Sequence, residues 1–479
     1  MLLNLKVRVR MKTKQLFSLL VAVAAMLGIA FLVPDLPGLD AKGRAALGVG
    51  VFAIIVWVTQ ALDDAQSGFC IVALLVLLGA AKLGPALSGY ANTGVWIVVL
   101  GLVMAAGMEI SGLSRRMALN MVSLAGASPV KMYWAVALIT LVMTFFIPSL
   151  GAKTLLLMPI IAQMGHAFGA EKGKSNMVKG LIFVVTITGT MYCLGIMTSH
   201  AANPITAGLL EKATGQPVTW AQWFKIGAPP AFVCGLLAVP ILLWMWPPEI
   251  KDISAGQAYV RRELEALGPM SFVEKYTMAV FLLTLALWAT DTYHRINPTL
   301  VAMISVVAMI APGPQQLMTW KQAEKKVPWN IFIVYGAGLS MGSVLVSSGA
   351  AAWIASTFFS PLACFDIKMQ VVILIWIMLV LQCLFTGAGP KTTALTPVVI
   401  AYATTQGIDP TPFVLLVGMN MLHQYLLPVS NLPNIIGLAT EEITPSELIK
   451  TGAVMSIFGA VFMSIMVYTY WTWIGMFAK

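Results

Sequence analysis

The sequence predicts an all-α membrane protein that crosses the bilayer many times. Of its 479 residues, 59% are hydrophobic and only 10% are charged, and the mean hydropathy is +0.87. Soluble chains carry about a quarter of charged residues. Many apolar runs approach or exceed the ~20 residues that a membrane-spanning helix needs. The alternating pattern of barrel strands is absent, so a helical bundle is favoured over an outer-membrane barrel.

We expect about 11 transmembrane helices and two re-entrant hairpins. The expected spans lie at about 15–34, 43–62, 68–85, 92–112, 176–204, 222–246, 276–291, 296–312, 329–348, 411–436 and 447–476. They form four parts of the chain: a cytoplasmic tail and first helix (1–42), a first repeat with a hairpin at 130–168 (43–248), a cytoplasmic connecting helix (249–275), and a second repeat with a hairpin at 368–405 (276–479). This topology places most lysines and arginines in the cytoplasm, either in loops or in the basic N-terminal tail, as the positive-inside rule requires.

One short motif occurs twice, once in each half of the chain. The pattern Gly-x-Lys-Thr-x-x-x-x-Pro spans residues 151–159 and again residues 389–397, each time between two long apolar runs. Proline and glycine at each tip break the helix, so Lys153 and Lys391 lie at membrane depth beside a non-helical turn. An ionisable side chain at that depth is a functional-site hypothesis by default.

Other features repeat in the same order with nearly the same spacing. The matched positions are Gly107 with Gly342, Gly112 with Gly349, Ser199-x-x-x-Asn203 with Ser430-x-x-x-Asn434, and Lys225-x-Gly227-Ala228 with Lys450-x-Gly452-Ala453. With the first helix set apart, each half has five spans and one hairpin, so the halves insert with opposite orientation. Matched helix breaks in two such halves are the best sequence pointer to the binding site of a secondary transporter.

The breaks predict an anion site near the middle of the membrane. A half-helix that begins in the membrane leaves backbone N–H groups free, and these attract anions. A buried ammonium is costly without a partner, so a small dianionic substrate would serve as both ligand and counter-ion. The candidate substrate-binding residues are Ser149, Gly151, Lys153, Thr154, Ser199, Asn203, Gly389, Lys391, Thr392, Ser430 and Asn434.

Each of these features also has a purely structural interpretation. A lone lysine can extend its charge to the membrane surface, and serine or asparagine at a break can cap a helix. His200 and His423 could couple protons to transport, or they could be satisfied packing residues. Glu109 could be a counter-ion for a lysine or an interfacial residue. A phosphate-binding loop is excluded, because no glycine directly precedes Lys153.

Other classes of protein fit less well. The five cysteines are scattered and predict neither disulfides nor a metal site. The net charge of +10 reflects loop lysines and arginines rather than nucleic-acid binding. A cation/proton antiporter would need intramembrane carboxylates, and an enzyme would need a nucleophile–base or metal cluster. We therefore expect a transporter with no cofactor, whose partners are its substrate and the lipid bilayer.

The chain resembles the divalent anion/sodium symporters, a family of di- and tricarboxylate carriers. The resemblance rests on residues 223–229 (Trp-Phe-Lys-Ile-Gly-Ala-Pro), 247–251 (Pro-Pro-Glu-Ile-Lys) and 427–434 (Leu-Pro-Val-Ser-Asn-Leu-Pro-Asn), and on the hairpins that end in Pro159 and Pro397. It implies an inner-membrane homodimer in which a mobile domain carries the site across the bilayer by an elevator motion.

The sequence departs from the family at the hairpin tips. The family's tips usually carry Ser-Asn-Thr triplets that bind substrate carboxylates and help to enclose sodium. Here the matching residues are 149–151 (Ser-Leu-Gly) and 387–389 (Gly-Ala-Gly), so only Ser149 remains, and a lysine follows two residues after each triplet. Sodium prefers such hard oxygen ligands. We therefore predict a sodium-independent dicarboxylate transporter that works by exchange or proton coupling. The alternatives are a sodium-coupled dicarboxylate symporter and a sulfate or sulfonate transporter.

Overall fold

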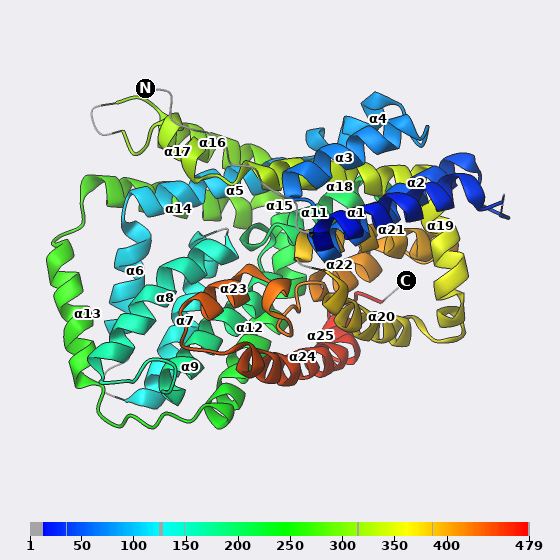
Figure 1. The fold of residues 1–479 in the computed structure, drawn as a ribbon. Coiled ribbons are helices and arrows are strands. Elements are labelled where there is room, and N and C mark those ends of the chain that lie inside the picture. Colours follow the sequence, from blue (N-terminus) through cyan, green and yellow to red (C-terminus); the bar gives the residue numbers. More distant parts are fainter. Residues whose placement is uncertain are drawn as a thin grey trace.

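A computed structural model describes residues 13–34, 36–123, 128–147, 149–313, 316–385 and 387–477 (Figure 1). Over these residues the regular structure is helical, and the one β-type contact is an isolated bridge between Leu36 and Leu39. The all-α prediction is confirmed for this part of the chain. The basic tail at residues 1–12, Pro148 at the first hairpin tip and Lys479 lie outside the described residues.

Nine helical segments of the described chain are long and apolar enough to cross a membrane. They are α1–η1 (Thr13–Leu32), α2 (Ala41–Thr59), α5 (Thr93–Ile110), α7 (Pro129–Phe146), α9–α10 (Asn176–Leu194), α12 (Trp220–Met245), α14 (Phe272–Ala289), α18 (Trp329–Ser347) and α24–α25 (Pro445–Trp473). Three shorter apolar helices are α3 (Asp64–Leu77), α16 (Pro298–Ile310) and α20 (Ile367–Leu381). Together they make the protein a multi-pass integral membrane protein.

The third expected span, at 68–85, is shorter in the structure. Helix α3 ends at Leu77, and Gly79 then adopts the left-handed conformation at φ 72°, which stops a right-handed helix. A separate short helix, α4 (Leu83–Leu87), follows this turn. The periodic apolar pattern gave no sign of the turn, because alanines and leucines continue through it.

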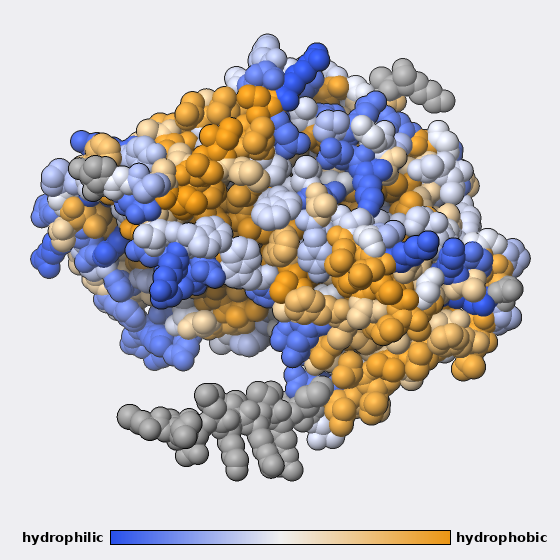
Figure 2. Space-filling view, turned by 90° about the horizontal axis from the view of Figure 1, so that it is seen from above, coloured by the Kyte–Doolittle hydropathy of each residue, from blue (hydrophilic) through white to orange (hydrophobic). Residues whose placement is uncertain are grey.

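The surface is suited to lipid. Figure 2 shows broad hydrophobic areas on one face of the molecule, with hydrophilic side chains concentrated in other regions. Helix α1 exposes Phe17 and Leu20, and α16 exposes Ile304 and Val307. Exposed apolar areas of this extent are what a bilayer covers.

Each expected hairpin is a pair of helices separated by a short non-helical tip. The first pair is α7 and α8 (Leu150–Ala167), and the second is α20 and α21 (Ala388–Thr405). Side chains cap the first arms at matched positions, since Ser128 accepts from Lys131 N and Asp366 accepts from Lys368 N and Met369 N. The two pairs lie toward opposite ends of the molecule in Figure 1.

The two predicted helix breaks are present. Helix α10 (Gly189–Leu194) ends before α11 (Ala202–Thr214), and α22 (Pro410–Asn420) ends before α23 (Leu432–Ala439). The two halves pack against each other at these breaks: α8 of the first half contacts α23 of the second, and α21 of the second half contacts α11 of the first. A hydrogen bond from Asn431 Nδ2 to Thr190 Oγ1 (3.2 Å) also joins the two halves. Each hairpin therefore meets the broken helix of the other repeat.

Matched glycines adopt matching conformations in the two halves. Gly112 and Gly349 are both left-handed, at φ 79° and 77°, just before a following helix. A Cβ on Gly227 would lie 3.0 Å from the carbonyl oxygen of Leu194, and a Cβ on Gly452 would lie 2.1 Å from that of Tyr425. Only glycine permits such close backbone contact. The sequence repeat is thus reproduced in backbone geometry and packing.

Several basic residues expected on the cytoplasmic side are held by acidic partners. Arg116 Nε donates to Glu274 Oε1 (2.7 Å), and Lys179 Nζ donates to Glu447 Oε1 (2.6 Å). Arg115 pairs with Glu263 of α13 (Ser254–Leu267), the helix expected to connect the halves, and Lys326 pairs with Glu109. Glu109 is therefore the partner of a loop lysine. It forms no ion pair with Lys153 or Lys391 among the described residues.

The helices form two groups that we name for later use. The scaffold group contains α1, α2, α3, α5, α14, α16 and α18, and occupies the upper part of Figure 1. The hairpin group contains α7–α12 and α20–α24, and occupies the central and lower part. The groups meet where α18 packs on α21 and α5 packs on α11.

Candidate functional site

Lys153 is buried at the start of α8 and is satisfied within the protein. Its side chain is 1% exposed, and Nζ donates to Thr144 Oγ1 (2.8 Å) and to Cys193 Sγ (3.2 Å). Thr144 Oγ1 in turn donates to the carbonyl oxygen of Thr140 (2.6 Å). Neither partner is a carboxylate, so the ammonium is hydrogen-bonded without an acidic counter-ion.

Lys391 is equally buried at the start of α21, yet its surroundings differ. Its side chain is 0% exposed, and Nζ has no hydrogen-bond partner among the described residues. The neighbouring Thr392 is also buried, and its hydroxyl is unpaired, whereas Thr154 at the matched position donates to the carbonyl oxygen of Leu150 (2.9 Å). An unpaired ammonium in an apolar interior is strongly disfavoured. The second tip is therefore the one with uncommitted polar groups.

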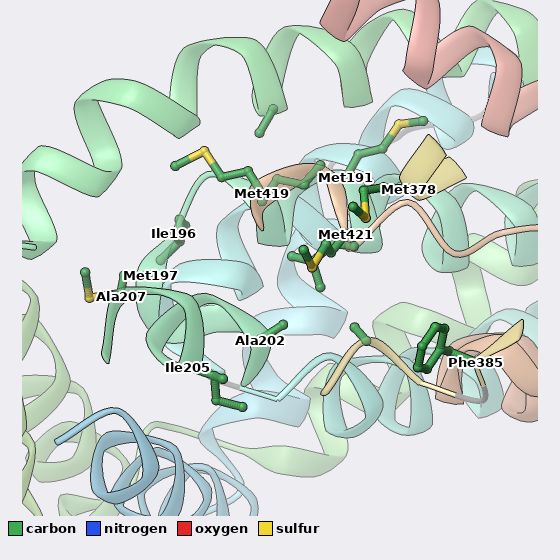
Figure 3. Packing of buried hydrophobic residues seen from close by; sticks show 14 of the residues in the cluster. Met191, Ile196, Met197, Ala202, Ile205, Ala207, Met378, Phe385, Met419 and Met421 are labelled. Carbon is green, nitrogen blue, oxygen red and sulfur yellow. The ribbon is translucent and has the colours of Figure 1, made fainter. Parts of the chain in front are cut away.

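Buried apolar side chains pack around the breaks. Figure 3 shows buried side chains from both broken helices, among them Met191 and Ile196 from the first repeat and Met419 and Met421 from the second. Such surroundings hold little water and strengthen electrostatic interactions. The two lysines lie in the kind of environment where an anion would be bound tightly, because it would neutralise their charge.

The serines and asparagines at the breaks bind backbone carbonyl groups. In the first break, Ser199 Oγ and Asn203 Nδ2 both donate to the carbonyl oxygens of Cys193 and Ile196, at 2.7–2.9 Å. In the second, Ser430 and Asn434 do the same for Gln424 and Leu427, at 2.8–3.5 Å. Each donor and acceptor residue of the first break is separated from its counterpart in the second break by the same number of residues. These side chains replace the hydrogen bonds that the broken helices have lost, so their donors are used within the protein.

Large side chains pack directly against the glycines at the tips. A Cβ on Gly151 would lie 2.3 Å from Cδ2 of Leu432, and a Cβ on Gly389 would lie 2.2 Å from Cε1 of Tyr335. Ser149 caps α8, accepting from Ala152 N (3.3 Å). Glycine at these positions is thus required for packing, as well as for the turn.

A cavity of about 340 Å³ reaches the first tip. Its lining includes Ser149, Gly151 and Leu432 from the hairpin group and the ion-paired Glu109 and Lys326 from the other side. A cavity of about 410 Å³ lies instead between α5, α11 and α16, and no described tip residue lines it. The smaller cavity is therefore the one related to the tips, and it is large enough for a small dianion.

The two histidines lie beside the breaks in different settings. His200 Nδ1 accepts from Ala202 N (3.1 Å) at the start of α11. His423 Nδ1 pairs with the hydroxyl of Tyr425 (3.1 Å), and its Nε2 is buried without a partner among the described residues. A role in proton coupling stays a prediction for both.

Four functional candidates were not foreseen from the sequence. Thr144 and Cys193 hold Lys153, and the residues at the matched positions of the second repeat are Gln382 and Gln424. Both glutamines are buried, and Gln382 Oε1 and both polar atoms of Gln424 lack partners in the described structure. The signal that could have found them is a polar amide inside an apolar run, at the same spacing that separates the two tips or the two breaks.

Residues 13–477 match the family described as the sodium:sulfate symporter transmembrane region. The chain belongs to this family. It is the divalent anion/sodium symporter family that the sequence resembles, and its members are transporters rather than enzymes. The match covers both repeats, both tips and both breaks.

Similar proteins come from several bacteria. A membrane protein of Cupriavidus necator is 31% identical over 96% of this chain and 93% of that protein. An uncharacterised transporter of Haemophilus influenzae is 27% identical over 85% of this chain and 86% of its own length. The sodium-dependent dicarboxylate transporter SdcS of Staphylococcus aureus (strain MRSA252) is 24% identical over 95% of this chain and 91% of its own length.

A solved structure shares the fold. The YdaH transporter of Alcanivorax borkumensis, whose crystal structure shows an unusual topology, superimposes with a TM-score of 0.58 at 13% identity. The alignment covers 89% of this chain and 98% of that chain. At this identity the likeness concerns the fold alone.

The hydrogen bonds at the second break predict a non-additive effect on stability. Ser430 and Asn434 both donate to the carbonyl oxygen of Leu427, so either one can satisfy it. We expect S430A and N434A each to cost less than about 1 kcal/mol, and S430A/N434A to cost about 1–3 kcal/mol more than their sum, because a buried carbonyl is then unpaired.

Thermal unfolding in detergent of the three variants would measure this coupling. S343A is the control, because the Ser343 hydroxyl bonds a carbonyl group in the middle of the regular helix α18. Additive effects at Ser430 and Asn434 would contradict the assigned role.

Proposed function

We propose that this protein is a secondary active transporter of small divalent organic anions in the bacterial inner membrane. The substrates would be dicarboxylates such as succinate, malate or fumarate. The observation that carries the proposal is the pair of ammonium groups, on Lys153 and Lys391, buried at the two hairpin tips without any ion-pair partner in the described chain. A dianion supplies the missing negative charge.

The relatives support the substrate class. Those from Staphylococcus are named as dicarboxylate transporters, and they align over most of this chain. The substrate-binding residues would come from both tips and both breaks, with the lysines supplying charge. Gly151 and Gly389 would allow close backbone approach, and the free carboxamide oxygen of Asn203 would accept a hydrogen bond from a substrate hydroxyl or from water.

We further propose that transport is independent of sodium, by exchange or by proton coupling through His200 or His423. A sodium ion needs several hard oxygen ligands. The tips offer few, because residues 149–151 contain one hydroxyl and residues 387–389 contain none. The hydroxyls of Ser199 and Ser430 are committed to backbone carbonyls. A tethered ammonium would take the place of the bound cation.

Uptake of labelled succinate into proteoliposomes tests this proposal. We expect uptake that requires dicarboxylate inside the vesicles, or an inward proton gradient, and that is unchanged when choline replaces sodium. Vesicles without protein are the control. Uptake that is driven by a sodium gradient would refute sodium independence and leave a sodium-coupled dicarboxylate symporter. It would also indicate that the relatives' ion dependence extends to this chain.

A second candidate substrate is sulfate or a sulfonate. The observation that favours it is the family description, which names sulfate, together with the loss of tip hydroxyl groups that would orient carboxylates. Failure of succinate, malate and fumarate to compete, together with saturable uptake of labelled sulfate, would select this candidate over the first.

We also propose an elevator motion in a homodimer, with the hairpin group moving against the scaffold group. At the boundary between the groups, Gly208 allows α11 to lie close to the residue that precedes α5. A Cβ on Gly208 of α11 would lie 3.1 Å from Cγ of Asn92, which precedes α5. Asn92 Nδ2 donates to the carbonyl oxygen of Gly208 (3.3 Å).

A disulfide across this boundary would test the motion. In N92C/G208C the sulfur of residue 92 would lie near the Cβ of residue 208, which suits a disulfide. We expect uptake to stop after oxidation and to recover after reduction, because the two groups are locked together. Each single cysteine variant, oxidised in the same way, is the control. Full uptake by the cross-linked protein would rule out relative motion at this boundary.

A further inference from the structure

We infer that the two repeats have different roles, and that the second repeat alone holds an anion-binding subsite. This subsite consists of Lys391, Thr392, Gln382 and Gln424 at the start of α21, and it takes one oxyanion group, a carboxylate or a sulfate. In the first repeat, Lys153 is an internal structural cation. This inference rests on the proposed function for the identity of the ligand, and it replaces one part of that proposal: of the two lysines named there, Lys391 alone binds the anion, whereas Lys153 is bound within the protein.

The contrast begins with the partners of the two lysines. Lys153 reaches Thr144 and Cys193, whose side chains are short enough to leave room for the ammonium and to accept its hydrogen bonds. In the second repeat, the counterpart of Thr144 is Gln382, because the two are separated by the same number of residues as the two tips. The counterpart of Cys193 is Gln424, because the two are separated by the same number of residues as the two breaks. Glutamine offers donors as well as acceptors, and neither one bonds to Lys391 in the structure.

Every member of the second set has unused hydrogen-bonding capacity. Lys391 Nζ, Thr392 Oγ1, Gln382 Oε1, and Gln424 Nε2 and Oε1 are buried without partners among the described residues. Each of these side chains is at most 1% exposed. One unpaired buried group costs about 1–3 kcal/mol, so several groups together are retained only if something else satisfies them.

Position in the fold brings these groups to one place. Lys391 lies in the first turn of α21, which packs against α22, and Thr396 Oγ1 of α21 contacts Met421 Sδ (3.9 Å), three residues before Gln424. Figure 3 places Met421 and Phe385, which lie near these residues in the chain, in the same buried region. The helix that carries Lys391 therefore packs beside the segment that carries Gln424, and Gln382 precedes the same hairpin tip in the chain.

The helix start adds to the attraction for an anion. Helix α8 is capped by Ser149, and the start of α11 is bound by Nδ1 of His200. Helix α21 has 18 residues and begins after Gly387, which supplies no side-chain cap. Its first N–H groups and the ammonium of Lys391 thus attract negative charge together.

The character of the unpaired groups selects an oxyanion. Lys391, Thr392 and the amide nitrogen of Gln424 are donors, which match the several acceptor oxygens of a carboxylate or sulfate. The ammonium itself repels a metal cation. The unpaired oxygens of Gln382 and Gln424 are acceptors, which the hydrogens of Lys391 and Thr392 can satisfy. At the first break the unpaired atom is Asn203 Oδ1, an acceptor, and the neighbouring Lys153 is already hydrogen-bonded within the protein. The asymmetry in hydrogen bonding is therefore also an asymmetry in charge preference.

Matched substitutions in the two repeats test the inference on the purified full-length protein. The measurement is binding of succinate and of sulfate, read both as ligand-induced thermal stabilisation and by calorimetry. We expect K391M to weaken binding of the bound anion about 10–100-fold, as expected for loss of charge-assisted hydrogen bonds, without lowering the unfolding temperature of the ligand-free protein. We expect K153M to lower that temperature and to change affinity less than about threefold.

A second variant keeps Lys391 but gives it hydrogen-bond partners within the protein. In Q382T/Q424C the second repeat receives the partners that Lys153 has, so Lys391 would be hydrogen-bonded within the protein. We expect about a tenfold loss of affinity or more, with a ligand-free unfolding temperature equal to or above that of the wild type. This variant also decides the question if K391M fails to fold. K174M, which alters an exposed lysine paired with Glu171, is the control for loss of positive charge.

The outcomes separate this inference from the proposed function. Equal affinity losses in K391M and K153M, with unchanged stability in both, would overturn the asymmetry. Unchanged binding in K391M, or in Q382T/Q424C if K391M does not fold, would overturn the subsite, as would absence of saturable binding of either anion by the wild type. Binding that depends on Lys391 in a protein that transports neither anion would uphold the subsite and refute the transport proposal.

Discussion

The cost of holding two ammonium groups in an apolar interior is the constraint on which the rest of this structure depends. Removing one such charge from water costs several kcal/mol unless hydrogen bonds or a counter-ion offset the loss. The first repeat meets the cost with Thr144 and Cys193, and the second has no such partners among the described residues. A transporter benefits from this difference, because a group that is satisfied only by substrate makes the loaded site more stable than the free one, and thereby couples binding to conformation.

The internal repeat of the sequence explains how one chain supports both situations. The two breaks share a backbone framework: Ser199 and Asn203 in one, and Ser430 and Asn434 in the other, bind carbonyl groups at equivalent positions. Gly227 and Gly452 let a neighbouring helix approach a backbone carbonyl beside each of those frameworks. The framework is therefore common to both halves, and the side chains placed on it are free to differ. Function can diverge between repeats without loss of the architecture that holds the tips.

Much of this organisation was predictable from the sequence, because it follows from local signals. Apolar runs of about 20 residues give the spans, and proline with glycine gives the tips and the breaks. The repeated Gly-x-Lys-Thr motif identified Lys153 and Lys391 as buried. The short end of α3 at Leu77 was missed because a single glycine conformation, at Gly79, decides it. Gln382 and Gln424 were missed because their importance depends on a structural fact: Lys391 has no hydrogen-bond partner among the described residues, whereas Lys153 has two. The hydroxyls of Ser199 and Ser430 bind carbonyl groups three and six residues earlier, which depends on the local path of the chain at each break and is not stated by the sequence pattern.

The central claim is that tethered ammonium groups, rather than bound sodium ions, supply the positive charge for a divalent anion. Equilibrium binding of radioactive sodium to the purified protein, with and without the transported anion, tests it most directly. The account predicts no saturable sodium binding in either condition, and anion binding that is the same in sodium and in choline. Saturable sodium binding that is strengthened by the anion would contradict it, because the ion would then be part of the loaded site.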